Sequence, residues 1–154
     1  FNLLMQQQPV ARDLRVISAA MKMVTDMERI GDHAADISEM TVMMANEPYV
    51  VDLSDIKKMA SETVLMLIRS IEAYVEKDML KAQSVIDHDD IVDELFNKVK
   101  QELIEMIRKN PAVSEQAADM LMVAKYFERI GDHATNLAEL IIFALDDKKN
   151  TMQN

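Results

Sequence analysis

The stretch Glu28–Ala34 (ERIGDHA) recurs letter for letter at Glu128–Ala134, 100 positions later in the chain. The similarity continues for six more residues, with ADISEM at 35–40 against TNLAEL at 135–140. A repeat at a fixed spacing indicates two copies of one structural unit. Each unit is therefore predicted to end in a helix that carries this motif.

The residues before the second motif predict two further helices. Ser54 and Asp78 are candidates for helix N-caps, and Asn110-Pro111 is expected to end one helix and open the last. Connections of only a few residues favour antiparallel neighbours in a bundle. We therefore predict an all-α fold, in which residues 54–147 form a complete antiparallel three-helix bundle.

The first motif stands on a helix without such partners. Pro9 is expected to open this helix, because proline suits the first helical position. Residues 1–46 would then be the last helix of a truncated first repeat, whose other helices are expected upstream of Phe1. Residues 47–53 are predicted to be a linker, and residues 148–154 a frayed tail.

Apolar residues at steps of three and four predict the buried face of each helix. These faces are Leu14, Ile17, Met21 and Val24; Ile56, Ala60, Val64, Leu67 and Ile71; Val85, Val92, Phe96, Val99, Leu103 and Met106; and Ala117, Leu121 and Ala124.

Composition excludes several classes of protein. Hydrophobic residues make up 49% of the 154 residues and charged residues 29%, which is typical of a folded domain. The net charge of −10, without a basic run, argues against nucleic-acid binding. The absence of cysteine excludes disulfides and thiolate zinc sites. No apolar run approaches the roughly 18 residues of a membrane span, so no membrane insertion is expected.

Carboxylates stand on or beside the faces that are expected to be buried. Glu28 continues the apolar stripe of the first helix, and Glu128 that of the last. On the third helix Asp89 interrupts the stripe, and Asp93 follows one turn later, just as Asp132 follows Glu128. A buried carboxylate is tolerated only with a cation or strong hydrogen bonds. Four converging carboxylates would hold a cation such as Mg, Mn, Fe or Ca.

Other residues of the motif leave more than one interpretation open. Gly31 and Gly131 each cost a helix about 1 kcal/mol, and they allow close approach of either a neighbouring helix or an ion. His33 and His133 follow the aspartates and point about 100° away from them, which favours a supporting or surface role over ligation. An ion pair between the arginine and the aspartate of each motif is a purely structural alternative. His88 is expected to be exposed.

Several stretches resemble the PhoU family of bacterial phosphate-uptake regulators. They are QQPVARDLR (7–15), MERIGDHAADI (27–37), VIDHDDIVDEL (85–95) and FERIGDHATNLAE (127–139). The resemblance implies two tandem three-helix bundles, each with a multinuclear site of iron, manganese, zinc or magnesium. It implies one complete site at Asp89, Asp93, Glu128 and Asp132, and half of another at Glu28, Asp32 and Asp36.

The resemblance also implies a function. PhoU proteins are negative regulators, so we expect a cytoplasmic, non-enzymatic adaptor between a phosphate ABC transporter ATPase and a sensor histidine kinase, with a homodimer as a further option. A PhoU-like cytoplasmic domain of a sodium–phosphate cotransporter is one alternative. A metal-dependent phosphoester hydrolase is another, although neither a general base nor a basic substrate clamp is visible. The last alternative is a purely structural bundle.

Overall fold

The computed structural model describes residues 2–146, and these form four long helices. The helices are α1 (Asn2–Met44), α2 (Ser54–Glu76), α3 (Met79–Lys109) and α4 (Ser114–Leu145), with a short 3-10 turn, η1 (Pro111–Val113), before α4. No strand occurs in the described part, so the all-α prediction is confirmed. The expected frayed tail, residues 148–154, lies outside the described residues.

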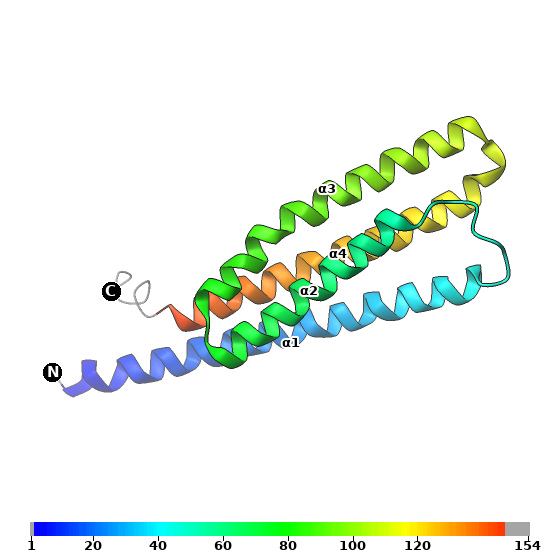
Figure 1. Cartoon of the computed structure of the whole chain (residues 1–154). Helices are drawn as coiled ribbons and strands as arrows, with labels where there is room; N and C mark the ends of the chain where they lie inside the picture. The colour runs from blue at the N-terminus through cyan, green and yellow to red at the C-terminus, as the bar shows by residue number, and fades with distance from the viewer. Residues whose placement is uncertain (1, 147–154) are drawn as a thin grey trace.

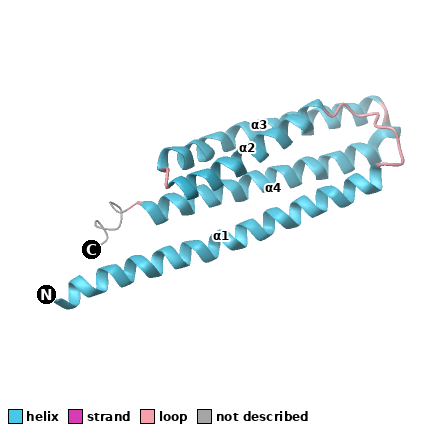
Figure 2. Ribbon diagram, turned by 60° about the horizontal axis from the view of Figure 1, so that its bottom comes forward, coloured by secondary structure: helices cyan, strands magenta, loops and turns pink. Residues whose placement is uncertain are grey.

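Helices α2, α3 and α4 form an elongated three-helix bundle in which consecutive helices run antiparallel (Figure 1). Helix α1 runs alongside α4, in the opposite direction, at the edge of this bundle (Figure 2). The two copies of the repeated motif therefore lie on the two helices that face each other, α1 and α4.

The core lies between α2, α3 and α4. Met59, Met66, Val85 and Val92 are almost fully buried there, as are small residues of α4 such as Ala124. The apolar face predicted for α3 is confirmed, since Val85, Val92, Val99 and Leu103 are all buried. Burying apolar side chains of this kind contributes most of the stability of a small domain.

The face predicted for α1 is wrong. The exposed residues include all four members of the expected stripe, namely Leu14, Ile17, Met21 and Val24. The face that packs on α4 carries instead Ala19, Met23 and Ile30, which are buried. Because α1 has apolar residues on two faces, periodicity alone selected the one with the larger side chains.

The face predicted for α2 is also partly wrong, because Val64 and Ile71 are exposed. The buried face includes Thr63 and Ser70, whose hydroxyls donate to the carbonyl oxygens of Ala60 (3.1 Å) and Met66 (2.8 Å). A hydroxyl that bonds to its own helix can be buried at little cost. Polar residue type was therefore a poor guide to burial on this helix.

Two of the four predicted helix starts, Pro9 and Ser54, need correction. Pro9 lies inside α1 and does not open it, because the preceding leucine, methionine and glutamine residues favour a helix that begins earlier. Ser54 does not cap α2 with its side chain; its N–H donates to the Asp52 carboxylate at 2.9 Å. Asp78 does cap α3, by accepting a hydrogen bond from the Lys81 N–H at 3.0 Å.

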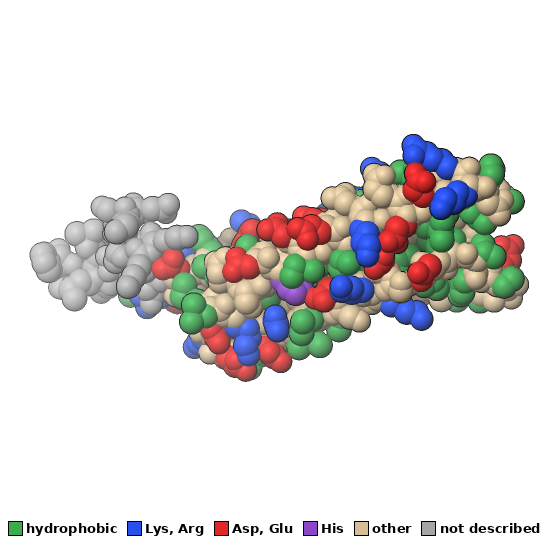
Figure 3. All heavy atoms as spheres, turned by 45° about the horizontal axis from the view of Figure 1, so that its top comes forward, with side chains coloured by type: hydrophobic (Ala, Val, Ile, Leu, Met, Phe, Trp, Pro, Cys, Tyr) green, Lys and Arg blue, Asp and Glu red, His purple; other side chains and the backbone are tan. Residues whose placement is uncertain are grey.

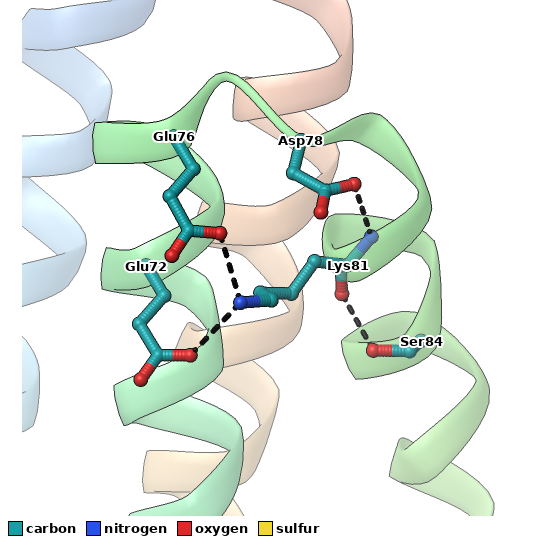
Figure 4. Close-up of polar contacts among 5 residues, drawn as sticks. All are labelled: Glu72, Glu76, Asp78, Lys81 and Ser84. Atoms are coloured by element: carbon teal, nitrogen blue, oxygen red, sulfur yellow. Dashed lines mark hydrogen bonds and ion pairs between the residues drawn. The ribbon is translucent and has the colours of Figure 1, made fainter.

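The tight connection between α2 and α3 is held by one lysine (Figure 4). Lys77 ends α2 in the left-handed region, with a φ of 53°, so that the chain reverses at once. The Lys81 ammonium then bridges back to Glu72 (3.2 Å) and Glu76 (2.9 Å) on α2. This connection fixes the antiparallel pairing of α2 with α3, the helix that carries two of the expected metal ligands.

The loop between α1 and α2, residues 45–53, is anchored to the start of α4. Val50 N–H donates to the side-chain oxygen of Gln116 (2.8 Å), and the Gln116 amide donates to the carbonyl of Pro48 (3.1 Å). Val51 is buried beside this contact. The loop therefore helps to hold α1 in its position along α4.

None of the helices in residues 2–146 combines the length and the apolar character that a membrane span requires.

The two glycines offer a matched pair of substitutions. A methyl group at Gly31 would meet nothing within 4 Å, whereas at Gly131 it would lie 3.4 Å from Val92 Cγ1 and 3.6 Å from Thr63 Cγ2. Gly31→Ala is therefore expected to raise the free energy of unfolding by about 0.5–1 kcal/mol, through helix propensity alone. Gly131→Ala should gain less, because Val92 has to accommodate the methyl group. Urea unfolding of both variants measures the difference, and a larger gain at Gly131 would contradict this account.

Candidate metal centre

Three of the predicted ligands come together between α3 and α4. Asp89 and Asp93 lie one turn apart on α3, and Asp132 faces them from α4. One carboxylate oxygen from each lies within 4.8 Å of the other two. Among residues 2–146 this is the one group of three acidic or histidine side chains arranged closely enough to share an ion. We call Asp89, Asp93 and Asp132 the acidic cluster.

Glu128 lies near the acidic cluster but turns toward a lysine. Its side chain is 13% exposed and forms an ion pair with the ammonium of Lys125, one turn earlier on α4. The Lys125 ammonium also lies 5.0 Å from the centre of the Phe96 ring. Glu128, the predicted fourth ligand, therefore lies at the site, but its carboxylate is paired with the Lys125 ammonium.

The acidic cluster carries a clear electrostatic penalty. Burial raises the pKa of Asp132 to about 6, and the charges of Asp89, Glu128 and Asp93 add to this effect. Burial also raises the pKa of Asp93, with contributions from Asp89 and Glu128. Burial likewise raises the pKa of Asp89, although the Thr135 hydroxyl partly offsets it. Like charges held together in this way are stabilised by a cation or a proton.

The cluster fits a hard cation. The Oδ1 atom of Asp89 is buried and has no hydrogen-bond partner among the described residues. Buried polar atoms are nearly always satisfied, so an orphaned carboxylate oxygen indicates space for a further partner. Asp89, Asp93 and Asp132 would hold such an ion through oxygen atoms alone, which suits magnesium, manganese or calcium.

The predicted half-site on α1 is not assembled in the same way. Glu28 and Asp32 are exposed on α1, as Asp132 is on α4, but neither belongs to a group of three potential ligands within residues 2–146. The Asp36 carboxylate lies 3.7 Å from the Nδ1 atom of His33. The two copies of the motif therefore have different surroundings despite their identical sequence.

The two histidines of the motif meet at the joint between α1 and α4. Their rings stack with centroids 5.6 Å apart. His133 pairs with Asp26 of α1 (2.8 Å), and His33 packs on Tyr126 of α4 (5.7 Å between centroids). Positions 26 and 126 are equivalent in the repeat, so each histidine contacts the equivalent position of the other repeat, a carboxylate in one direction and an aromatic ring in the other. The histidines therefore join the two repeats, and neither belongs to the acidic cluster.

The histidine pair favours uncharged imidazole at His33. Burial lowers the pKa of His33, and the charges of His133 and Arg129 lower it further, while Asp36 partly offsets them. A neutral His33 can stack on His133 without repulsion between two cations.

The structural alternative for the motif receives little support. Within residues 2–146, Arg129 forms no ion pair with Asp132, and its guanidinium lies 6.0 Å from the Tyr126 ring instead.

Gly131 is buried against Val92 and Thr63, which favours close helix packing as the reason for that glycine. Gly31 is exposed and has no such neighbour.

Sequence analysis missed two polar side-chain contacts, one beside the acidic cluster and one between α2 and α3. One is Lys125–Glu128, which was readable from its spacing of three residues. The other joins His88 of α3 to Glu62 of α2, so the expectation that His88 is exposed is wrong. Its side chain is 17% exposed. Glu62 is 26 positions away, and only the packing of α2 on α3 reveals this pair.

The surface around these elements is mixed in charge. Figure 3 shows acidic side chains in several groups, with lysines and arginines between them, and no continuous basic area on the face shown. This agrees with the net charge of −10.

Comparison with known proteins gives a consistent result. Residues 1–41 and 56–141 match the family described as the PhoU domain. A phosphate-specific transport system accessory protein PhoU homolog of Clostridium acetobutylicum is 38% identical over 145 residues, covering 94% of this chain and 66% of that protein. A protein of the same description from Caulobacter vibrioides is 35% identical over 154 residues, covering 99% and 67%.

A solved structure agrees with these sequence matches. The crystal structure of PhoU from Pseudomonas aeruginosa superposes with a TM-score of 0.85 at 29% identity, covering 93% of this chain and 69% of that one. This chain spans about two-thirds of the length of the curated relatives that it matches. On these grounds the chain belongs to the PhoU domain family.

Proposed function

We propose that this chain acts in phosphate uptake as a cation-dependent adaptor, which links a phosphate ABC transporter to its regulation. In this role it binds the transporter ATPase and a sensor histidine kinase in the cytoplasm when phosphate is plentiful. It has no catalytic step of its own. The observation that carries the proposal is the match to accessory proteins of the phosphate-specific transport system along nearly the whole chain.

The fold supports an adaptor rather than an enzyme. The molecule is a long bundle with extended helical faces, which suits the binding of partner proteins. The names of the relatives also favour a separate accessory protein over a domain of a cotransporter.

The acidic cluster supports the cation-dependent part of the proposal. A divalent cation would supply positive charge that neutralises Asp89, Asp93 and Asp132, the residues that would hold it. Once the repulsion between these three carboxylates is neutralised, they would hold α3 and α4 at a fixed separation. The cation would therefore stabilise the bundle and, with it, the helical surface that partners contact.

Binding of purified components tests the adaptor role. The protein is immobilised, and the ATPase and the histidine kinase from the same genome are passed over it in excess phosphate, once with Mn²⁺ and once with EDTA. We expect binding of at least one partner, and weaker binding in EDTA. An Asp93→Asn variant should resemble the EDTA condition. Failure of both partners to bind in every condition would refute the adaptor role, whatever the metal content.

A further inference from the structure

Lys125 occupies a distinctive position beside the acidic cluster. Its ammonium forms an ion pair with Glu128, and Phe96 of α3 lies under it at 5.0 Å. The Lys125 side chain is 39% exposed, while that of Glu128 is only 13% exposed. The lysine therefore reaches inward from the surface to a carboxylate that is largely shielded from water.

The charge of Lys125 acts on two of the three members of the acidic cluster. It lowers the pKa of both Asp93 and Asp132, in opposition to the burial and the carboxylate repulsion that raise them. Without a bound cation, this ammonium partly neutralises Glu128, Asp93 and Asp132.

The repeat provides an internal comparison. The position equivalent to Lys125 in the first motif is Thr25, whose hydroxyl donates to the carbonyl of Met21 at 3.3 Å. Glu28, the counterpart of Glu128, is exposed. Among the described residues, only the second copy of the motif therefore has a lysine paired with its glutamate. Lys125 is thus a feature of this site and not of the motif.

We propose that Lys125 competes with a divalent cation for Glu128 and thereby sets the affinity of the acidic cluster for metal. This inference rests on the proposed cation-dependent function. When a cation binds to Asp89, Asp93 and Asp132, Glu128 turns from the ammonium to the ion as a fourth ligand. The Lys125 ammonium then moves into solvent, because two positive charges repel each other at such short range.

Lys125 would also weaken binding before any ligand moves. A cation that approaches the cluster meets the positive charge of the ammonium as well as the negative charge of the carboxylates. Metal uptake therefore requires an ion concentration high enough to displace an ammonium that is always present. The chain would in this way exclude cations that its carboxylates alone would hold.

The test is calorimetric titration of the metal-free protein with Mn²⁺. Lys125→Gln keeps most of the length and the helix propensity of lysine but removes the charge. We expect it to lower the Kd by up to about fivefold, since an ion pair at a protein surface is worth at most about this factor. Lys125→Arg, which keeps the charge, should bind within about twofold of the wild type.

Lys98→Gln is the matched control. Lys98 also lies on the surface of the bundle and also forms an ion pair, with Asp55 at 3.4 Å, but it is outside the acidic cluster. Its substitution should change the Kd by less than about twofold at 0.15 M salt. If Lys98→Gln lowers the Kd for Mn²⁺ as much as Lys125→Gln does, the effect comes from net charge alone and the proposal is overturned.

A second measurement follows the lysine itself. The rate at which an amine-reactive ester modifies the Lys125 Nζ atom is measured by peptide mass spectrometry, with and without Mn²⁺. Release from Glu128 should raise this rate several-fold, while the rate at Lys98 stays constant. An unchanged rate at Lys125 would contradict displacement of the ammonium.

The outcomes separate the two proposals. If the wild type binds Mn²⁺ and Lys125→Gln binds it equally well, the competition is refuted and the metal site stands. If Mn²⁺ binds only to Lys125→Gln, the competition is supported, whereas the cation dependence proposed for the wild type is refuted at the concentrations used. If neither protein binds Mn²⁺, with both folded by circular dichroism, the metal site and the competition fall together.

Discussion

Addition of Mn²⁺ to the metal-free protein is expected to raise its melting temperature by about 5–10 °C when the ion is present at about 100 times its Kd. The reason is that the ion binds the folded acidic cluster and not the unfolded chain. A ligand at that excess stabilises the folded state by about 2.7 kcal/mol, and a domain of this size gains about 2–4 °C for each kcal/mol. Differential scanning calorimetry in EDTA and in Mn²⁺ measures the shift.

The repeated motif supplies the control for this prediction. Asp132→Asn should abolish most of the shift, because Asp132 contributes one of the three converging oxygens. Asp32→Asn changes the same residue in the identical motif on α1, where no such group is formed within residues 2–146, and it should leave the shift intact. Equal shifts in both variants would place the ion elsewhere.

Acidification is expected to stabilise the metal-free protein between about pH 7.5 and about pH 5, the reverse of ordinary acid denaturation. The pKa of Asp132 is raised to about 6 in the folded protein from a usual value of 3.8, and those of Asp89 and Asp93 are raised as well. A raised carboxyl pKa means that the ionised form destabilises the fold. This penalty is complete above the folded pKa of about 6 and is relieved progressively as the pH falls from about 6 toward 3.8.

Urea unfolding across this pH range tests the sign. His33, whose pKa is lowered, contributes in the opposite direction, so the informative quantity is the difference between the wild type and Asp132→Asn. The variant should be the more stable at pH 7.5, and its advantage should shrink toward pH 5. Saturating Mn²⁺ should reverse the slope for the wild type, because protons then compete with the ion. A wild type that simply loses stability in parallel with Asp132→Asn would refute the electrostatic account.

The acidic cluster was largely predictable from sequence because its residues break a regular pattern. Asp89 stands where the apolar stripe of α3 calls for a large aliphatic residue, between Val85 and Val92, both of which are buried. Asp93 follows by helix geometry alone. The identical motifs then singled out Asp132. Helical period and residue type were sufficient here, since α3 has one clearly apolar face.

The same reasoning failed on α1 and α2 for a physical reason. Periodicity reports which faces are apolar, but only the neighbouring helix decides which of them is covered. On α1 the smaller Ala19 allows close approach of α4, whereas Leu14 and Ile17 remain exposed. On α2 the hydroxyls of Thr63 and Ser70 are satisfied within the helix, so these polar residues are buried.

Contacts between the repeats were beyond prediction from one sequence. The stacking of His33 on His133 depends on the register of two helices that are not adjacent in the chain. Asp26 gave no signal of its own, because it stands outside the repeated motif. The partner of the Glu128 carboxylate could not be predicted either. Spacing alone does not decide whether it pairs with a lysine one turn away or with an ion held by α3.

Asp132 and His133 are consecutive, so one turn of α4 presents an oxygen to the acidic cluster and an imidazole to α1. A small roll of α4 about its own axis would carry both groups together. If a bound ion draws Asp132 toward α3, the same rotation pulls His133 along the ring of His33 and against its bond to Asp26. The contact between α1 and α4 is therefore mechanically coupled to the acidic cluster. Binding of an ion on one side of α4 would shift the histidine contacts on its other side.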